Sequence, residues 1–321
     1  MLQTFELYID NNGNIQSPAV VDGLRWETWR AGSPSKLTFE VVKDDAANFV
    51  EGNAVILKVN GENVFFGFVF KKRRCKNHII QVTCYDQTRY LKNKDTYIYT
   101  NKTASDVIRM VAVDFELQLG EIAPTDYVIP CRDENNTELF DIINSALDLE
   151  LVHAGNMFIL FDDFGKLTLK SISDMKVDLV IDEETGENFD YTSSINDRTF
   201  NRVKLVRENN ETGMRDVYVV QHGQNIDRWG ILQYFGTLQE GESGEVKAAA
   251  ILDLFNAKTR KLKLKNVIGD TRIRAGKMPI IDLDLGDIIV RNHMLVEYCL
   301  YRIYESEYWM NLTLRGGDIH G

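Results

Sequence analysis

Asp163, Phe164 and Gly165 form a triplet that matches the metal-binding Asp-Phe-Gly of protein kinases. A kinase also needs a glycine-rich loop over the phosphates, a lysine on a neighbouring strand and a His-Arg-Asp catalytic loop. None of these accompanies the triplet in the sequence. Because the triplet lies between two apolar segments, we interpret it as the turn of a β-hairpin rather than as a site for metal and ATP.

Carboxylates in the segment IIDLDLGD, residues 280–287, could bind a hard cation. Asp282 and Asp284 would share one face of a strand, and Asp287 would follow the next turn. The leucines that alternate with these acids are typical of any half-exposed strand. We therefore expect an acidic face toward solvent or a channel, with no metal and no other cofactor, and we keep the cation site as an alternative.

The remaining residues that could perform catalysis do not form a known motif. The five histidines are far apart, and none lies in a His-Glu-x-x-His motif or near a Gly-x-Ser-x-Gly serine. A glycosidase pair of carboxylates needs proximity in space and not in sequence, so it could be present among the many Asp and Glu residues. We expect this chain to have no enzymatic activity, and a cell-wall hydrolase is the alternative. The histidines are His78, His153, His222, His293 and His320.

The net charge of -11 argues against a general nucleic-acid binder, which needs a basic face to neutralise phosphates. One basic cluster, Lys71 to Arg74 followed by Lys76, interrupts this acidic chain. We predict that it lies on an exposed hairpin tip. A nucleic-acid patch is one alternative, and docking of Lys72, Arg73 and Arg74 onto an acidic partner subunit is another.

Cysteine usage and apolar runs bear on the cellular compartment. The four cysteines lack Cys-x-x-Cys spacing, so we expect reduced thiols rather than a zinc site or a disulfide. The apolar runs are too short to cross a bilayer, and the start MLQTFELYID lacks the basic and apolar regions of a signal peptide. We expect synthesis in the cytoplasm. The cysteines are Cys75, Cys84, Cys131 and Cys299.

Two aromatic segments are candidate partner surfaces. The first pairs Trp26 and Trp29 with a turn that begins at Arg30 and contains Pro34. At least one of these tryptophans should pack in the core, because buried aromatics dominate cores as well as interfaces. The second is the loop DRWGILQYFG, residues 227–236, for which partner binding and a structural role are equally plausible. Its three aromatic residues are Trp229, Tyr234 and Phe235.

The elements that must position these residues are mostly strands in region 1–95. Leu37, Phe39 and Val41 alternate with polar residues, and NGEN at 60–63 is a hairpin signal between two apolar strands. Several short antiparallel strands predict a small β-barrel or sandwich. The strands expected here are 4–9, 36–42, 54–59, 64–71 and 79–85.

Region 96–185 predicts an α/β domain of two helices and a hairpin. Thr103 can cap the first helix, while Asp106 complements the helix N-terminus. The second helix is expected near 137–149. The hairpin that follows would join strands 157–161 and 166–171, and both helices should pack against it.

Region 186–321 returns to strands and predicts a second β domain. A helix capped by Ser243 and running over 245–261 belongs to an excursion from this domain at about 225–264. The fold class is therefore α+β and β-rich. The strands expected in this region are 202–207, 217–221, 270–274, 287–290, 295–306 and 312–315.

Four segments spread over all three regions resemble baseplate hub proteins of contractile phage tails, PBSX-type prophages and phage-tail-like bacteriocins. The order of strands, helix pair with hairpin, and strands is similar to the hub portion of type VI secretion spikes. None of the segments is a catalytic signature. They are 30–42, TASDVIRMVAVDFEL at 103–117, MFILFDDFGKLTL at 157–169, and GDTRIRAG at 269–276 followed by Gly286-Asp287.

The resemblance implies two barrel domains that are similar to tail-tube subunits and are separated by the α/β middle domain. It implies a homotrimer that joins the six-fold tail tube to the three-fold central spike as a structural, non-enzymatic part of the baseplate. The implied partners are the tube protein, the spike protein, the tape measure and other baseplate proteins, with no membrane and no specific nucleic acid. A tail-associated hydrolase and a glycan-binding adhesin remain the alternatives.

Overall fold

The computed structural model describes residues 4–43, 48–74, 76–196, 198–209, 214–238, 242–285, 288–304 and 307–316. Cys75, His320 and the Gly286-Asp287 pair lie outside these ranges. The described residues form mostly strands with a few helices, which confirms the β-rich α+β class.

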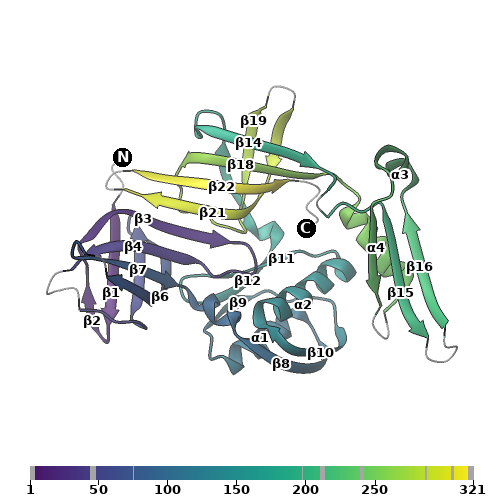
Figure 1. Cartoon of the computed structure of the whole chain (residues 1–321), viewed down its shortest axis with the longest axis horizontal. Coiled ribbons are helices and arrows are strands. Elements are labelled where there is room, and N and C mark those ends of the chain that lie inside the picture. Colours follow the sequence, from purple (N-terminus) through teal and green to yellow (C-terminus); the bar gives the residue numbers. More distant parts are fainter. Residues whose placement is uncertain are drawn as a thin grey trace.

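A sheet of 11 strands runs through most of the molecule, in the order β14-β18-β22-β21-β3-β4-β7-β6-β5-β1-β2 (Figure 1). All of its neighbouring strands are antiparallel. Strands from the two ends of the chain meet where β3 pairs with β21. The strands are β1 Phe5–Asn11, β2 Asn14–Gln16, β3 Val20–Trp29, β4 Lys36–Val42, β5 Ala54–Val59, β6 Glu62–Arg74, β7 Ile79–Tyr85, β14 Asn188–Ser194, β18 Thr259–Ile268, β21 Leu295–Ile303 and β22 Tyr308–Gly316.

The period-2 pattern of these strands builds a single core. In β4, Leu37, Phe39 and Val41 are buried while the residues between them are half-exposed, as predicted. One hydrophobic cluster includes these residues together with Leu264 of β18 and Leu314 of β22. The first and last regions of the chain therefore share a core as well as a sheet. A second small sheet beside it contains β13 (Lys176–Ile181), β19 (Met278–Asp284) and β20 (Ile289–His293).

The middle region has the predicted helix pair and hairpin, with a separate core. Helices α1 (Ala104–Asp114) and α2 (Leu139–Ala154) pack their apolar faces on the strands of this region. The hairpin of β11 (Phe158–Asp162) and β12 (Leu167–Ser171) is extended by β9 (Leu119–Ile122), which runs parallel to β12. The other elements are η1 Gln87–Lys92, β8 Lys94–Lys102, β10 Ile129–Glu138 and η2 Ile172–Met175.

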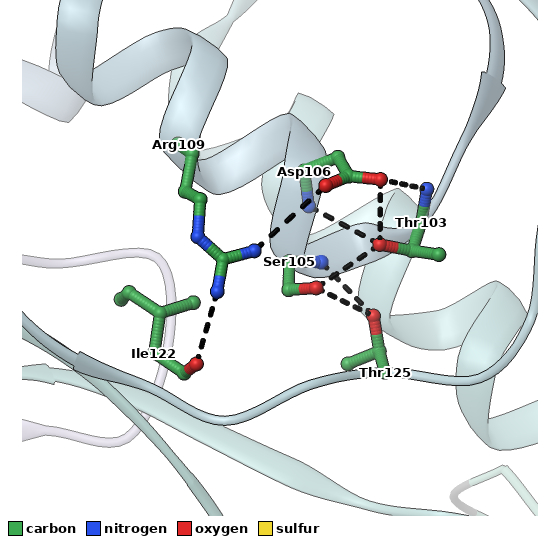
Figure 2. A network of polar contacts seen from close by, with 6 residues as sticks. All are labelled: Thr103, Ser105, Asp106, Arg109, Ile122 and Thr125. Carbon is green, nitrogen blue, oxygen red and sulfur yellow. Dashed lines mark hydrogen bonds and ion pairs between the residues drawn. The ribbon is translucent and has the colours of Figure 1, made fainter.

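A capping box begins α1 as the sequence predicted (Figure 2). The Asp106 amide donates to Thr103 Oγ1 at 3.3 Å, and the Thr103 amide donates to Asp106 Oδ2 at 3.1 Å. The Ser105 amide donates to Thr125 Oγ1 at 3.0 Å, and Arg109 Nη2 donates to the Ile122 carbonyl at 3.2 Å. This network ties the first two turns of α1 to the end of β9 and to the segment that follows it.

Helix α2 differs from its predicted bounds of 137–149 at both ends. It begins at Leu139, because Thr137 and Glu138 still belong to β10. It continues to Ala154 and stops at Gly155, which has the left-handed φ of 78°. The sequence pattern therefore located the apolar face correctly but missed the glycine stop.

The part of the last region between β14 and β18 forms a separate lobe, seen at the right of Figure 1, which we call the outer lobe. Its three-stranded sheet has the order β16-β15-β17, with α4 packed on one face. Thr199 Oγ1 donates to the Ala257 carbonyl at 2.9 Å, which joins the two ends of the lobe. Its elements are β15 Arg202–Asn209, β16 Met214–Gln221, α3 Gly223–Trp229, β17 Gln233–Thr237 and α4 Gly244–Phe255.

Three expectations for the last region were wrong. Strands 202–207 and 217–221 belong to the outer lobe and not to the main sheet, so the excursion begins well before residue 225. The helix predicted to reach 261 ends at Phe255, and Thr259 already begins β18. Segment 270–274 forms turns rather than a strand, because the Asp270 side chain accepts from the backbone amide of Arg272 at 2.9 Å.

Candidate assembly surfaces

The pairing of β3 with β21 is stabilised by a column of three aromatic rings. Trp26 stacks on Tyr301 at 5.1 Å between ring centroids, and Tyr301 stacks on Tyr308 at 4.8 Å. Trp26 Nε1 donates to Ser35 Oγ at 2.8 Å, and the Tyr301 hydroxyl donates to the Asp270 carbonyl at 2.6 Å. Burial raises the pKa of Tyr301 well above its ordinary value. Trp26 is therefore a core residue.

The other residues predicted around this turn, apart from Pro34, are more exposed to solvent than Trp26. Pro34 is buried, whereas Trp29 is half-buried and lies 5.4 Å from the Tyr298 ring. Arg30 Nε donates to Glu297 Oε2 at 2.6 Å, and the backbone amide of Arg30 donates to the Glu297 carbonyl at 3.0 Å. These contacts connect the turn to β21. Of the four candidate residues Trp26, Trp29, Arg30 and Pro34, a partner could therefore reach Trp29 and Arg30.

The basic cluster spans the end of a strand and the hairpin turn that follows it, where Lys76 is exposed. Strand β6 continues to Arg74, and Lys72 pairs in register with Val82 of β7. The Lys72 Nζ donates to the Phe49 carbonyl and lies 4.2 Å from the centroid of the Phe49 ring. Burial, as the main cause, lowers the pKa of Lys72. Arg73 and Arg74 remain exposed and available to a partner.

The predicted aromatic loop 227–236 is instead the end of α3 and most of β17. Trp229 is half-buried at the end of the helix. Tyr234 points toward α4 and meets the Phe200 ring at 5.4 Å, edge to face. Phe235 is on the opposite face of the sheet and is 56% exposed. Adjacent residues of β17 thus serve two different surfaces.

The solvent face of the outer-lobe sheet carries exposed apolar side chains on its two outer strands, β16 and β17. Phe235 pairs in register with Lys204 of β15, which pairs in turn with Val219 of β16. Val217 and Val219 are 52% and 44% exposed. Since α4 covers only the opposite face, these side chains form a surface of the kind that binds another protein. The sequence signal for this surface was the alternating pattern of β16, which led us to expect a strand of the second β domain.

Two buried carboxylates lie between the first region and the middle hairpin. Asp86 accepts from the Thr88 amide at 3.1 Å, and Asp162 Oδ1 accepts from the Gly165 amide at 2.8 Å. Burial raises the pKa of both carboxyls, and the charge of Asp162 raises that of Asp86 further. Asp86 is 2% exposed and Asp162 is 4% exposed, so a bulk glycan substrate has no access to this pair. Their contacts fit a structural role.

The other residues with side chains suited to chemistry also make structural contacts. Asp163 and Phe164 form the hairpin turn, in which the Asp163 amide donates to the Lys166 carbonyl at 2.7 Å. Asp282 is ion-paired with Arg291 at 2.8 Å, and Asp284 faces solvent. Among the described residues no group of His, Cys, Asp and Glu could hold a metal ion. No helix in the described ranges is long and apolar enough to cross a membrane.

The four described histidines are far from one another in the fold. His153 stacks on Tyr127 at 4.1 Å, and His222 Nδ1 accepts from the Asn225 amide at the start of α3. His293 Nδ1 lies 2.9 Å from the Met278 carbonyl. His78 occupies the turn between β6 and β7. These positions and contacts fit a structural role.

Comparison with known proteins identifies the family of this chain. The model of the YqbQ-like family matches residues 24–315. This chain belongs to the YqbQ-like family. It is homologous to the Phage-like element PBSX protein XkdQ of Bacillus subtilis (strain 168), with 32% identity over 235 residues that cover 70% of each protein. The resemblance to PBSX-type prophage proteins is therefore confirmed.

Solved structures share the fold at low sequence identity. The prophage MuSo2 43 kDa tail protein from Shewanella oneidensis has a TM-score of 0.71 at 13% identity, over 98% of this chain and 100% of that chain. The E. coli c3393 protein, a component of the type VI secretion system, has a TM-score of 0.63 at 11% identity, over 98% of this chain and 78% of that chain. The YqbQ-like family thus shares its fold with prophage tail proteins.

Proposed function

We propose that this chain is the baseplate hub of a contractile injection system, made in the bacterial cytoplasm and incorporated into a phage tail or tailocin baseplate. The observation that carries the proposal is the match of 98% of the chain to the full length of a prophage tail protein. The relation to XkdQ of the phage-like element PBSX supports the same assignment. The proposed role is structural and not enzymatic.

The proposed hub is a homotrimer that joins the six-fold tail tube to the three-fold spike. Regions 1–95 and 186–321 would each supply one tube-like barrel, so that three chains present six similar units to the tube. The E. coli c3393 protein is structurally similar to the T4 bacteriophage tail proteins gp27 and gp5, which supports a place between tube and spike. An obligate trimer would bury on the order of 2,000 Å² per interface.

A symmetry adaptor needs a fixed angle between its two halves, and the pairing of β3 with β21 would fix that angle. Strand β3 pairs with β21 over residues Leu24 to Trp29, so the two halves share backbone hydrogen bonds. Trp26 and Tyr301 stack across this pairing inside the common core. Because close-packed cores resist deformation, this connection supports a rigid adaptor rather than a hinged one.

The partner surfaces in this proposal are those left accessible by the fold. The exposed face of the outer lobe, with Phe235 and Val219, would bind a neighbouring subunit or the spike. Arg73 and Arg74 would dock on an acidic partner such as the tube. Trp29 and Arg30 would make further contacts at the edge of the main body. The tape measure and other baseplate proteins are additional proposed partners.

Co-expression with the tail-tube and spike proteins of the same gene cluster tests the proposal. We expect the hub to co-purify with both and to show a ring of three copies in electron microscopy. A peptidoglycan turbidity assay and a glycan array on the same preparation test the hydrolase and adhesin alternatives. Turnover that a single carboxylate substitution abolishes, or glycan affinity without affinity for tube and spike, would overturn the hub assignment.

A further inference from the structure

A cavity of about 450 Å³ lies where the three regions of the chain meet. Trp26 of β3 lines it from the first region, Phe161 of β11 from the middle region, and Arg274 and Lys277 from the segment between β18 and β19. Lys176 at the start of β13 completes the basic part of the wall. We call this cavity the junction pocket.

The junction pocket is cationic although the chain carries a net charge of -11. Five basic side chains line it against two acidic ones, Asp163 and Asp178. Such a concentration of positive charge raises the local concentration of anions and favours their binding. The basic residues are Lys170, Lys176, Arg272, Arg274 and Lys277.

Three of these cations, Lys176, Arg274 and Lys277, form no ion pair among the described residues. Arg272 is ion-paired with Asp270 at 2.7 Å, and Lys170 lies 3.5 Å from Glu121. For Lys176 and Lys277, by contrast, no ion pair is formed within the described part of the chain. The ammonium groups of these two lysines are therefore available to a ligand.

Arg274 lines the pocket and has one hydrogen-bond donor unused. Its Nη1 donates to the Asp162 carbonyl at 2.6 Å, and its guanidinium lies 4.8 Å from the centroid of the Phe161 ring. Its Nε is buried and has no hydrogen-bond partner within the described residues. A buried donor without a partner carries a free-energy cost that a bound anion would relieve.

The electrostatics of Lys277 agree with an excess of positive charge in the pocket. Burial lowers the pKa of Lys277, and the neighbouring charges of Arg274 and Lys170 lower it further, against the opposite effect of Asp163. Burial raises the pKa values of the nearby Asp86 and Asp162 carboxyls, and the charge of Arg274 acts on both in the opposite direction.

We propose that the junction pocket binds the carboxylates of an acidic segment of a partner polypeptide. Val64, Phe164 and Val177 give the pocket an apolar wall beside its lysines, so a segment that alternates acidic and apolar residues fits both. A nucleic acid fits less well, because the overall charge of -11 repels an extended polyanion and the lysines form a pocket and not a stripe. This inference goes beyond the hub assignment, because it concerns a pocket within one chain and not the assembly of three chains.

Fluorescence anisotropy on the purified chain tests the inference. The probe is a fluorescein-labelled hexapeptide of alternating glutamate and leucine, and the matched neutral probe alternates glutamine and leucine. We expect the acidic probe to bind at least tenfold more tightly than the neutral one. Lys176→Gln combined with Lys277→Gln should weaken binding by about tenfold, whereas Lys277→Arg should retain it.

A charge-matched control separates the pocket from general electrostatics. Lys94→Gln combined with Lys258→Gln changes the net charge equally at exposed positions outside the pocket, and it should leave the affinity within about twofold. The inference is overturned if this control weakens binding as much as the pocket variant does. It is also overturned if the acidic probe does not bind at millimolar concentration, or if a DNA hexanucleotide competes more strongly than the unlabelled peptide. Failure here would leave the trimer and its test unaffected.

Discussion

Trp26 and Tyr301 stack with ring centroids 5.1 Å apart and an interplanar angle of 13°, although one lies in β3 and the other in β21 near the opposite end of the chain. Trp26 is 2% exposed and Tyr301 is fully buried. The contact thus joins the two regions that the family resemblance implies as separate barrels. Removing either ring should weaken the connection between them.

Substituting Trp26→Ala should lower the free energy of unfolding by about 3–5 kcal/mol, because a large buried ring is lost and a cavity remains. The Ser35 hydroxyl would also lose the donor that binds it at 2.8 Å. Urea denaturation followed by far-UV circular dichroism measures the change. Trp29→Ala is the matched control in the same strand, and its smaller burial predicts a loss of about 1–2 kcal/mol. Equal losses for the two variants would contradict a core role specific to Trp26.

Phe235→Ser should leave folding stability within about 0.5 kcal/mol of wild type, because the side chain is exposed. If the exposed face of the outer lobe binds a partner, the same variant should weaken assembly with the spike or a neighbouring subunit by about tenfold. The neighbouring Tyr234→Ser removes a ring that packs toward α4, so it should instead cost about 2–3 kcal/mol of stability. Thermal unfolding and co-purification measure the two effects. Assembly of Phe235→Ser at wild-type affinity would exclude this face as an interface.

Asp86→Asn should flatten the pH dependence of stability. Between the ordinary carboxyl pKa, near about 4, and the raised pKa of the folded state, the folded chain holds a proton that the unfolded chain has released. The free energy of unfolding therefore falls as pH rises through this window, by at most about 1.4 kcal/mol per pH unit for one group. Asn cannot titrate but can still accept from Thr88. Urea unfolding at pH 5, 6, 7 and 8 should show a shallower slope for the variant, and identical slopes would refute the assignment.

Thr103→Ala should cost about 1 kcal/mol of stability, because it removes the side-chain cap of α1. Ser243 offers a control, since it occupies the N-cap position of α4 without a side-chain hydrogen bond. Ser243→Ala should therefore change stability by less than about 0.5 kcal/mol. Differential scanning calorimetry of both variants compares them directly. A loss of equal size at both caps would show that the Thr103 network in Figure 2 contributes nothing beyond helix propensity.

Local signals in the sequence predicted the elements that depend on neighbouring residues. The capping box at Thr103 and the alternation of Leu37, Phe39 and Val41 each reflect interactions within a few positions, and both are confirmed. The hairpin between β11 and β12 was predicted for the same reason. Element ends were less accurate. The stop of α2 at Gly155 depends on one backbone angle that hydrophobic periodicity does not encode.

Relationships between distant segments could not be read from the sequence. The pairing of β3 with β21 and the junction pocket bring together residues from opposite ends of the chain. Glu297, Tyr301 and Lys277 were therefore not identified as candidates. The end of β6 was predicted too early because the strand continues through charged residues, which a period-2 apolar pattern does not predict. Tyr234 and Phe235 are consecutive residues of β17 that point to opposite faces of the sheet, whereas the sequence suggested a single aromatic loop.

The mass of the purified chain in solution tests the hub assignment most directly. Size-exclusion chromatography with multi-angle light scattering across a concentration series should give three times the 36.8 kDa of one chain, alone or after addition of the spike protein. Imaging of that species should show a ring with a central hole. A stable dimer, or a monomer at every concentration even with the spike present, would contradict the proposed trimeric adaptor.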